Sequence, residues 1–269
     1  MKSEPGSTSV EVVALRGGAS ETRPETVVVE EPLELRLDGA PLAITMRTPG
    51  DDIELAAGFL VTEGIVADFG AVNAIAHCDE TGNVVEIRTE PGAAGVRVPE
   101  TRHFFASSSC GVCGKATLEA LRVIAPALHA DGLRVDADML AALPARLRAA
   151  QPLFRETGAL HAAGLFDAHG ALLCAREDVG RHNAVDKVVG WAALERRLPL
   201  SGTILLASGR LGFEIAQKAL VAGIPLLAAI SGPSSLAVEL ARENGMTLIA
   251  FLRGNALNIY SGAERIRLP

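Results

Sequence analysis

The chain has 269 residues, of which 49% are hydrophobic, and its formal net charge is −7. A chain of this length can bury a large core, so we expect two domains, or one large domain with an appendage. The negative charge argues against nonspecific nucleic-acid binding, which needs a basic surface that displaces phosphate counterions. Because no apolar run is long enough to span a membrane and the first residues lack the apolar core of a signal peptide, we predict a cytoplasmic protein without a membrane anchor.

Residues 1–100 are predicted to form a small α+β domain. Apolar and alternating patterns indicate strands at 27–30, 33–37, 42–46, 72–76 and 84–88. Turn residues at 38–41 and 79–83 join the second strand to the third and the fourth to the fifth as hairpins. A Gly- and Pro-rich stretch at 90–99 is the candidate boundary of this domain.

Between the two predicted hairpins, the sequence predicts a helix that ends at Gly64. Asp51 stands at the N-cap position, and Glu54 follows three residues later, as in a capping box. One face of this helix is apolar and consists of Leu55, Ala56, Phe59 and Leu60. We expect that face to pack in the core.

Two cysteines, Cys110 and Cys113, lie three positions apart in a loop rich in glycine and serine, ahead of a helix predicted at 116–125. A helix N-terminus and a nearby cation such as Lys115 lower the pKa of a thiol and enlarge its reactive thiolate fraction. In a reducing cytoplasm such a pair points to catalysis or metal binding. Half of a zinc site or a simple disulfide is the alternative interpretation. The other two cysteines, Cys78 and Cys174, are predicted to be inert.

Residues 101–269 are predicted to form an α/β domain. A helix at 139–150 precedes a hairpin at 160–166 and 171–175, and another helix runs through Trp191. From there strands and helices alternate, at 204–207, 213–221, 225–230, 235–243 and 247–251. This alternation predicts a mainly parallel sheet, in which ligands bind beyond the carboxyl ends of the strands.

The carboxyl ends of the last three predicted strands carry similar residues. The residues are Ser208, Gly209 and Arg210 after the first strand, Ser231 after the second, and Leu252 to Leu257 after the third. Glycines and serines before helices offer N–H groups to phosphate oxygens, and Arg210 and Arg253 add bidentate charge. We interpret this edge as a nucleotide or pyrophosphate site, with Arg181, Lys187 and Lys218 as further candidate cations. Ordinary turn and cap chemistry explains the same residues without a ligand.

Several common motifs are excluded. The cysteine loop lacks the spacer of a P-loop and has Ala116 where a P-loop needs Ser or Thr, and no Gly-x-Gly-x-x-Gly follows a strand. A zinc deaminase would place His-x-Glu ahead of Pro-Cys-x-x-Cys. Here Ser109 replaces the proline, and His161 and His182 follow the cysteines. A structural zinc site would need two further ligands, and the chain has no second CxxC.

Five stretches in this order resemble the formate dehydrogenase accessory sulfurtransferase family. They include Ser108-Ser-Cys-Gly-Val-Cys-Gly114, and the others are 47–64, 158–163, 177–187 and 208–260. The resemblance implies a small α+β domain beside a cytidine-deaminase-like α/β/α domain, in a protein that forms homodimers. A single CxxC is weak evidence, whereas five ordered stretches over nearly the whole chain are specific.

The resemblance also implies a function and site residues. It implies a sulfurtransferase that accepts sulfane sulfur from a pyridoxal-phosphate cysteine desulfurase and passes it to the molybdenum of a bis(molybdopterin guanine dinucleotide) cofactor, which is then installed in formate dehydrogenase. Matched by position, Cys110 holds the persulfide and Cys113 assists. The residues implied to contact the cofactor are Leu252, Arg253, Gly254, Asn255, Ala256 and Leu257. The rival hypothesis is a chaperone that only holds the cofactor, with a metal or a disulfide at the two cysteines.

Four titratable residues admit two interpretations. His161 and His182, with Glu177 and Asp178, could take part in chemistry, because a histidine of near-neutral pKa deprotonates thiols. A polar residue packed at a strand end is an equally good explanation. The large aromatic residues fit apolar helix faces and are predicted to be core, namely Phe59, Trp191 and Phe213.

Overall fold

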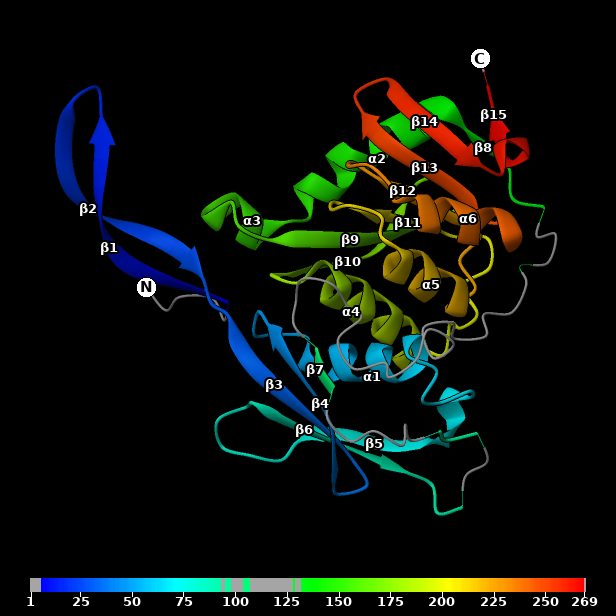
Figure 1. Cartoon of the computed structure of the whole chain (residues 1–269), viewed down its shortest axis with the longest axis horizontal. Coiled ribbons are helices and arrows are strands. Elements are labelled where there is room, and N and C mark those ends of the chain that lie inside the picture. The colour runs from blue at the N-terminus through cyan, green and yellow to red at the C-terminus, as the bar shows by residue number, and fades with distance from the viewer. Residues whose placement is uncertain (1–5, 93–94, 98–103, 107–127, 129–131, 269) are drawn as a thin grey trace.

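The computed structural model describes residues 6–92, 95–97, 104–106, 128 and 132–268. These residues form a mixed α/β fold with two large sheets (Figure 1). The helix predicted at 116–125 and both loop cysteines, Cys110 and Cys113, lie outside the described residues. No helix within the described ranges is long and apolar enough to cross a membrane.

The N-terminal sheet has five strands in the order β5-β6-β3-β4-β7. The strands are β3 (Glu31–Leu37), β4 (Ala40–Arg47), β5 (Val72–His77), β6 (Val84–Thr89) and β7 (Phe104–Ala106). Both predicted hairpins are confirmed, because β3 pairs antiparallel with β4 and β5 with β6. β7 pairs with β4, so this sheet includes residues beyond position 100.

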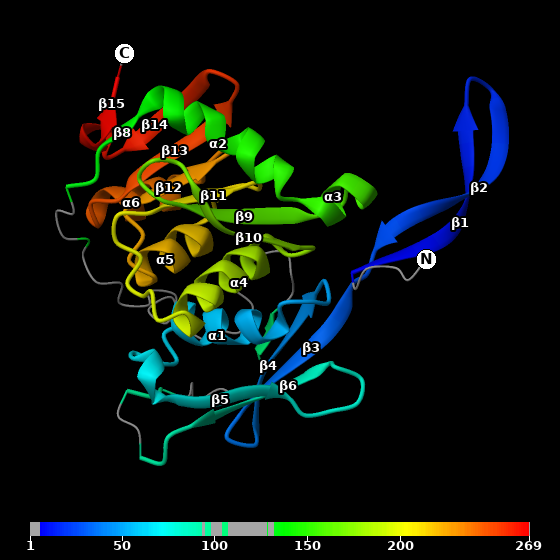
Figure 2. The ribbon, with the colours of Figure 1, turned by 180° about the vertical axis from the view of Figure 1, so that it is seen from behind.

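A long hairpin that the sequence did not predict precedes this sheet. It consists of β1 (Ser7–Arg16) and β2 (Ala19–Val28), paired antiparallel, and it extends away from the rest of the molecule in both views (Figures 1 and 2). Most of its side chains are exposed, including Val13 and Leu15. Its strands therefore lack the alternation of buried and exposed positions that identifies a strand in a sequence.

Helix α1 (Asp52–Thr62) lies between the N-terminal sheet and helix α4 (Arg181–Leu194) (Figure 1). Two glycines allow the close approach of the helices. A Cβ atom on Gly58 would lie 1.8 Å from the carbonyl oxygen of Asp186, and one on Gly190 would lie 1.7 Å from that of Glu54. Any other residue at these positions would push the helices apart.

The capping box predicted for α1 is wrong. Asp51 occupies the N-cap position with a left-handed backbone (φ 56°), but its side chain makes no capping hydrogen bond. Asp51 and Glu54 both pair with Arg176 instead, at 3.4 Å and 2.5 Å respectively. A strong ion pair to another element has replaced the local cap.

The C-terminal sheet has six strands in the order β10-β9-β11-β12-β13-β14. The strands are β9 (His161–Phe166), β10 (Leu172–Asp178), β11 (Ile204–Ala207), β12 (Leu226–Ala229), β13 (Thr247–Arg253) and β14 (Ala256–Ser261). β11, β12 and β13 are parallel, as predicted, but β9 pairs antiparallel with β11 and β14 with β13. The sheet is therefore mixed, and β10 runs in the same direction as the three parallel strands.

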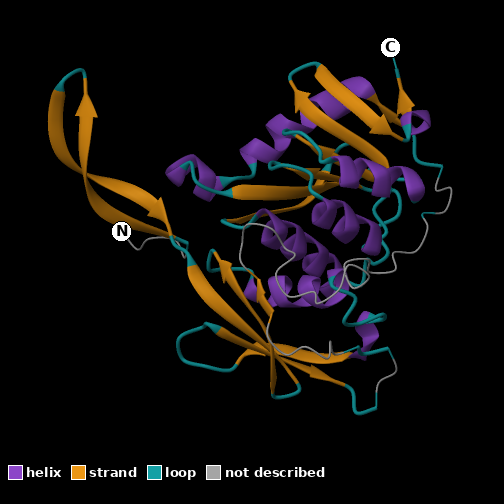
Figure 3. Ribbon diagram, viewed as in Figure 1, coloured by secondary structure: helices purple, strands orange, loops and turns teal. Residues whose placement is uncertain are grey.

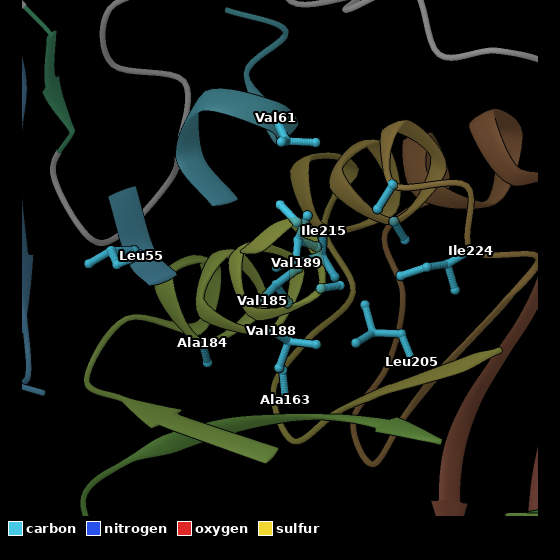
Figure 4. Close-up of a cluster of buried hydrophobic side chains, with 14 of the residues drawn as sticks. Leu55, Val61, Ala163, Ala184, Val185, Val188, Val189, Leu205, Ile215 and Ile224 are labelled. Carbon is cyan, nitrogen blue, oxygen red and sulfur yellow. The ribbon is translucent and has the colours of Figure 1, made fainter. Parts of the chain in front are cut away.

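Helices cover both faces of this sheet (Figure 3). On one face, α4, α5 (Phe213–Val221) and α6 (Ser235–Glu243) share a core with Leu205 and Ala207, and Figure 4 shows Val185, Val188 and Val189 of α4 in that core. On the other face, α2 (Ala137–Ala149) packs over Ile204 and Leu206. The alternation of neighbouring β11 residues between two cores is the period-two signature of a strand buried on both sides.

One hydrophobic core connects the two halves of the chain. It includes Leu33 and Leu35 of the N-terminal sheet together with Leu205 and Leu227 of the C-terminal sheet. Phe59 and Trp191 pack half-buried against it, as predicted for core aromatic residues. The domain boundary at residue 100 stays a prediction.

The remaining elements are short. Helix α3 (Pro152–Thr157) follows α2, and β8 (Val135–Asp136), which directly precedes α2, pairs with β15 (Ile266–Arg267). Single 3-10 turns occupy Phe69–Ala71 and Ala263–Arg265.

Candidate functional site

Four strands of the C-terminal sheet end at one edge. β10, β11, β12 and β13 run in the same direction, so the loops that follow them meet there, together with the start of the oppositely directed β9. In the register of the sheet, Asp178 at the end of β10 lies opposite His161 at the start of β9. We call this the strand edge. It is where ligands bind in open α/β sheets.

Backbone hydrogen bonds hold the loops of the strand edge together. The N–H of Leu211 donates to the carbonyl of Gly232 (3.1 Å), and the N–H of Ser234 donates to the carbonyl of Leu211 (2.8 Å). The N–H of Phe251 donates to the carbonyl of Ser231 (3.1 Å). The structure therefore brings Ser208, Gly209, Arg210 and Ser231 to one edge, as the sequence predicted.

The segment 252–257 is the turn of a β-hairpin. Leu252 is fully buried, whereas Arg253, Gly254, Asn255 and Ala256 are exposed, and Leu257 packs half-buried against the second core. The Nε of Arg253 donates to the carbonyl of Ile230 (3.0 Å), which ties this turn to the end of β12. A ligand at this segment would contact the exposed turn. It could contact Leu252 only through the backbone, because the Leu252 side chain is buried.

Phe251 belongs to this edge and was not singled out from the sequence. The residue is 43% exposed, its backbone has a positive φ of 54°, and a Cβ atom on Gly232 would lie 2.8 Å from its Cζ atom. A positive φ is rare for a bulky residue and often marks a functional position. No sequence pattern signals such a conformation.

Two histidines from separate elements belong to the strand edge, and one of them, His161, lies beside Gly209. His161 begins β9, and His182 lies in the first turn of α4. A Cβ atom on Gly209 would lie 3.2 Å from Nδ1 of His161 and 3.5 Å from Cβ of Arg181, so a side chain at this position would crowd the imidazole. The Nε2 atom of His182 lies 3.8 Å from Oε2 of Glu214 in the first turn of α5.

The Nε2 atom of His182 is buried and has no hydrogen-bond partner in the structure as described. A buried polar atom without a partner costs about 1–3 kcal/mol, so its presence calls for an explanation. The pKa of His161 is lowered from its ordinary value of 6.5, first by burial and then by the charges of Arg181, His182 and Arg210. His161 is therefore neutral at pH 7.

Glu214 is the carboxylate of this cluster, and no sequence motif had singled it out. Burial acts to raise its pKa, but interactions with His182, a backbone N–H and Arg181 outweigh burial and hold the pKa below its ordinary value of 4.5. The side chain is therefore ionised at neutral pH. The only sequence signal that could have identified Glu214 is its position in the first helical turn after the loop that contains Ser208.

Asp178 and Glu177 hold the cluster in place. Asp178 is fully buried and accepts hydrogen bonds from the N–H groups of Thr48 (3.2 Å) and Gly180 (2.8 Å) and from Nδ2 of Asn183 (2.9 Å). Glu177 accepts from the N–H groups that begin α3, those of Leu153 and Phe154. These contacts explain both acids as supports of the fold.

The two lysines predicted as further cations are not available to a ligand. Lys187 is 1% exposed and lies 2.8 Å from Asp178, and its Nζ also donates to the carbonyl of Thr48. Lys218 is buried and pairs with Asp186 (2.9 Å) and Glu63 (2.9 Å). The arginines differ, because Arg210 and Arg253 are exposed at the edge.

The described cysteines behave differently from each other. Cys78 is exposed, whereas Cys174 is buried, and burial raises the pKa of the Cys174 thiol to about 12. The predicted inertness is therefore supported for Cys174 by its burial. Within the described ranges, no three His, Cys, Asp or Glu side chains are placed to hold a metal ion.

This fold and edge define a class of protein: a mixed α/β protein with a basic, histidine-containing site where parallel strands end. A solved structure has the same architecture, the "Crystal structure of a putative formate dehydrogenase accessory protein from Desulfotalea psychrophila". It is 27% identical, with a TM-score of 0.78 over 98% of this chain and 100% of that one.

The sequence comparisons identify the family. The model of the FdhD/NarQ family matches residues 28–267. A protein of Streptomyces coelicolor named "Sulfur carrier protein FdhD" is 55% identical over 96% of this chain and 94% of its own length. A protein of Mycobacterium tuberculosis with the same name is 52% identical over 91% and 93%. The chain belongs to the FdhD/NarQ family.

Proposed function

We propose that this chain is a sulfur carrier that serves formate dehydrogenase. The observation that carries the proposal is its identity of more than half, over nearly full length, to proteins named as sulfur carriers. The structural neighbour from Desulfotalea psychrophila, which is named as an accessory protein of formate dehydrogenase, supplies the link to that enzyme. Sulfur transfer needs a reactive thiol, and the sequence offers the dithiol of Cys110 and Cys113.

In this proposal the carrier works as a sulfurtransferase with a persulfide intermediate. The thiolate of Cys110 attacks the terminal sulfur of a persulfide on a cysteine desulfurase, the donor's S–S bond breaks, and the donor thiolate leaves. Cys110 then holds the sulfur as a persulfide. The thiolate of Cys113 attacks Sγ of Cys110, which forms a disulfide and expels the terminal sulfur as hydrosulfide. A cellular dithiol restores both thiols.

The acceptor that we propose is the molybdenum of a bis(molybdopterin guanine dinucleotide) cofactor, bound as substrate at the strand edge. Its pyrophosphates need cations and N–H donors, and the exposed guanidinium groups of Arg210 and Arg253 supply charge at that edge. The arrangement proposed for this domain is cytidine-deaminase-like, in a cytoplasmic homodimer.

A complementation experiment tests the function. Bacteria that lack their own carrier would be supplied with the wild-type chain or with Cys110→Ala, and formate dehydrogenase activity would be measured. We expect the wild type to restore activity and Cys110→Ala to abolish it. The control is Cys78→Ala, which removes an exposed thiol of the N-terminal sheet region and should restore activity fully.

The same experiment distinguishes the carrier from the chaperone. A chaperone that only holds the cofactor needs no sulfur on Cys110, so the Cys110→Ala variant would support wild-type activity. That result would contradict the carrier proposal.

A further inference from the structure

The side chains of His161, His182 and Glu214 form a polar cluster at the strand edge, and the packing of the sheet does not need them. His161 comes from β9, His182 from α4 and Glu214 from α5, so three elements contribute titratable groups to the strand edge. Two arginines lie beside His161: a Cβ atom on Gly209 would lie 3.2 Å from Nδ1 of His161 and 3.5 Å from Cβ of Arg181, and Arg210 is the next residue along the chain. Packing of β9 against β11 needs none of these side chains, because it is made by apolar residues.

The charges around His161 come from three neighbouring elements. Asp178 ends the neighbouring strand β10, Arg181 and His182 begin α4, and Arg210 lies in the loop after β11. The carboxylate of Asp178 is already neutralised by Lys187 at 2.8 Å. The ionised carboxylate of Glu214 interacts with His182 and Arg181 and offsets one positive charge. With Arg181 and Arg210 both present, an excess of positive charge remains around His161, which favours an anion beside a neutral imidazole.

The described residues of the cluster do not form a metal site by themselves. Among the residues that the structure describes, no group of three His, Cys, Asp or Glu side chains is arranged to hold a metal ion. A neutral imidazole near two cationic arginines is suited to proton transfer. It can accept a proton from a weak acid, and the arginines can stabilise the anion that results.

We propose that this cluster is a thiol-activating site, in which His161 accepts the proton of a thiol and Arg181 and Arg210 stabilise the thiolate. The S–H bond breaks, its electron pair stays on sulfur, and the proton moves to a ring nitrogen of His161, from which solvent later removes it. His182 and Glu214 hold the segments around His161 in position. This proposal deepens the proposed function, which needs thiolates as nucleophiles, and it rests on that function for its biological purpose.

The thiol could come from this chain or from another molecule, and two measurements distinguish the sources. The first follows the alkylation of Cys110 and Cys113 by iodoacetamide between pH 5 and 9, with peptide masses identifying the cysteine. The second loads the chain with persulfide sulfur and follows the release of sulfide by added dithiothreitol. Each is made on the wild type, His161→Gln, Arg210→Ala and the control His169→Gln, whose side chain is exposed in the turn between β9 and β10.

We expect His161→Gln to slow one of these reactions by roughly tenfold or more at pH 7, because a thiol of ordinary pKa is only a few per cent ionised there. Arg210→Ala should slow the same reaction several-fold, and His169→Gln should leave it unchanged. Slower alkylation assigns the thiol to this chain, and slower sulfide release alone assigns it to an outside molecule. Every thiol reacts more slowly in acid, so the pH profile of the wild type is compared with that of His161→Gln. The difference between the two should disappear as the pH falls through the folded pKa of His161, which lies below its ordinary value of 6.5, because a protonated His161 accepts no proton.

Unchanged rates for both His161→Gln and Arg210→Ala would overturn the proposal. If His161→Gln fails to fold, Arg210→Ala decides, since Arg210 is exposed. Alkylation needs no sulfur donor, so it also separates this inference from the proposed function. A wild type that never acquires persulfide, but whose alkylation depends on His161, would contradict the carrier and leave the thiol-activating site in place.

Discussion

The Nζ atom of Lys187 lies 2.8 Å from Oδ2 of Asp178, and the two side chains are 1% and 0% exposed. Because the N–H of Thr48 also donates to Asp178 and the carbonyl of Thr48 accepts from Lys187, this pair joins the N-terminal sheet to the strand edge. Asn183 extends the connection, since its Nδ2 donates to both Asp178 and the carbonyl of Met46. The position of α4, and with it of His182, depends on this pair.

The first prediction concerns this ion pair. Lys187→Met leaves the carboxylate of Asp178 buried without a cation, and we expect the free energy of unfolding in urea to fall by roughly 3–5 kcal/mol. The double variant Asp178→Asn with Lys187→Met should recover part of that loss. The control is Arg267→Ala, which removes an exposed pair with Asp136 and should cost about 1 kcal/mol or less. Equal effects of Lys187→Met and Arg267→Ala would contradict this role.

The second prediction concerns the crossing of α1 and α4. Gly190→Ala places a Cβ atom within 1.7 Å of the carbonyl oxygen of Glu54, so the helices must separate. We expect the free energy of unfolding to fall by about 1–3 kcal/mol or more, because overpacking a core usually costs that much. Ala145→Ser, at an exposed position of α2, is the control and should change stability by about 0.5 kcal/mol or less. A Gly190→Ala variant as stable as the wild type would show that the crossing is looser than described.

The third prediction concerns the two described cysteines, in a variant that carries Cys110→Ala and Cys113→Ala. At pH 8 a maleimide should label Cys78, which is exposed, and leave Cys174 unlabelled. Burial raises the pKa of the Cys174 thiol to about 12, so almost no thiolate is present and the reagent cannot reach it. Urea should expose Cys174 and make both cysteines react. Rapid labelling of Cys174 in the folded protein would contradict its burial.

The fourth prediction concerns pH and Glu214. The pKa of this carboxyl group is lower in the folded protein than its ordinary value of 4.5. The ionised group therefore contributes stability at pH values above 4.5, and that contribution is lost as the pH falls through the lower, folded pKa. Glu214→Gln should destabilise the protein at pH 7 and have little effect in strong acid, as measured by urea unfolding at both pH values. An equal destabilisation at pH 7 and in strong acid would contradict a lowered pKa for Glu214.

Local patterns predicted much of the fold because they reflect burial. The hairpin of β3 and β4 has alternating buried residues and turn residues between its strands, and the unit from β11 to β13 has apolar strands with glycines that end the helices. The β1–β2 hairpin was missed because its side chains are exposed on both faces, so no periodicity marks it. The hairpin of β9 and β10 was predicted and is confirmed, but the antiparallel pairing of β9 with β11 and the strand β14 were not predicted, since they depend on contacts between distant segments.

The candidate site was predicted in part for a similar reason. Residues that follow strands, such as Ser208 and Ser231, reach one edge whenever the strands are parallel, so the sequence placed them together. Whether a cation faces solvent or a carboxylate depends on packing, and Lys187 and Lys218 proved to be buried in ion pairs. The positive φ of Phe251 and the approach of His161 to Gly209 are likewise set by the tertiary fold.

The most direct test of the carrier is mass spectrometry of the purified wild-type chain after incubation with a cysteine desulfurase and free cysteine. We expect a mass increase of one sulfur atom, located by peptide mapping on Cys110, sensitive to reduction and missing from Cys110→Ala. A wild-type chain whose cysteines acquire no sulfur, under conditions in which the desulfurase itself carries a persulfide, would contradict the carrier proposal.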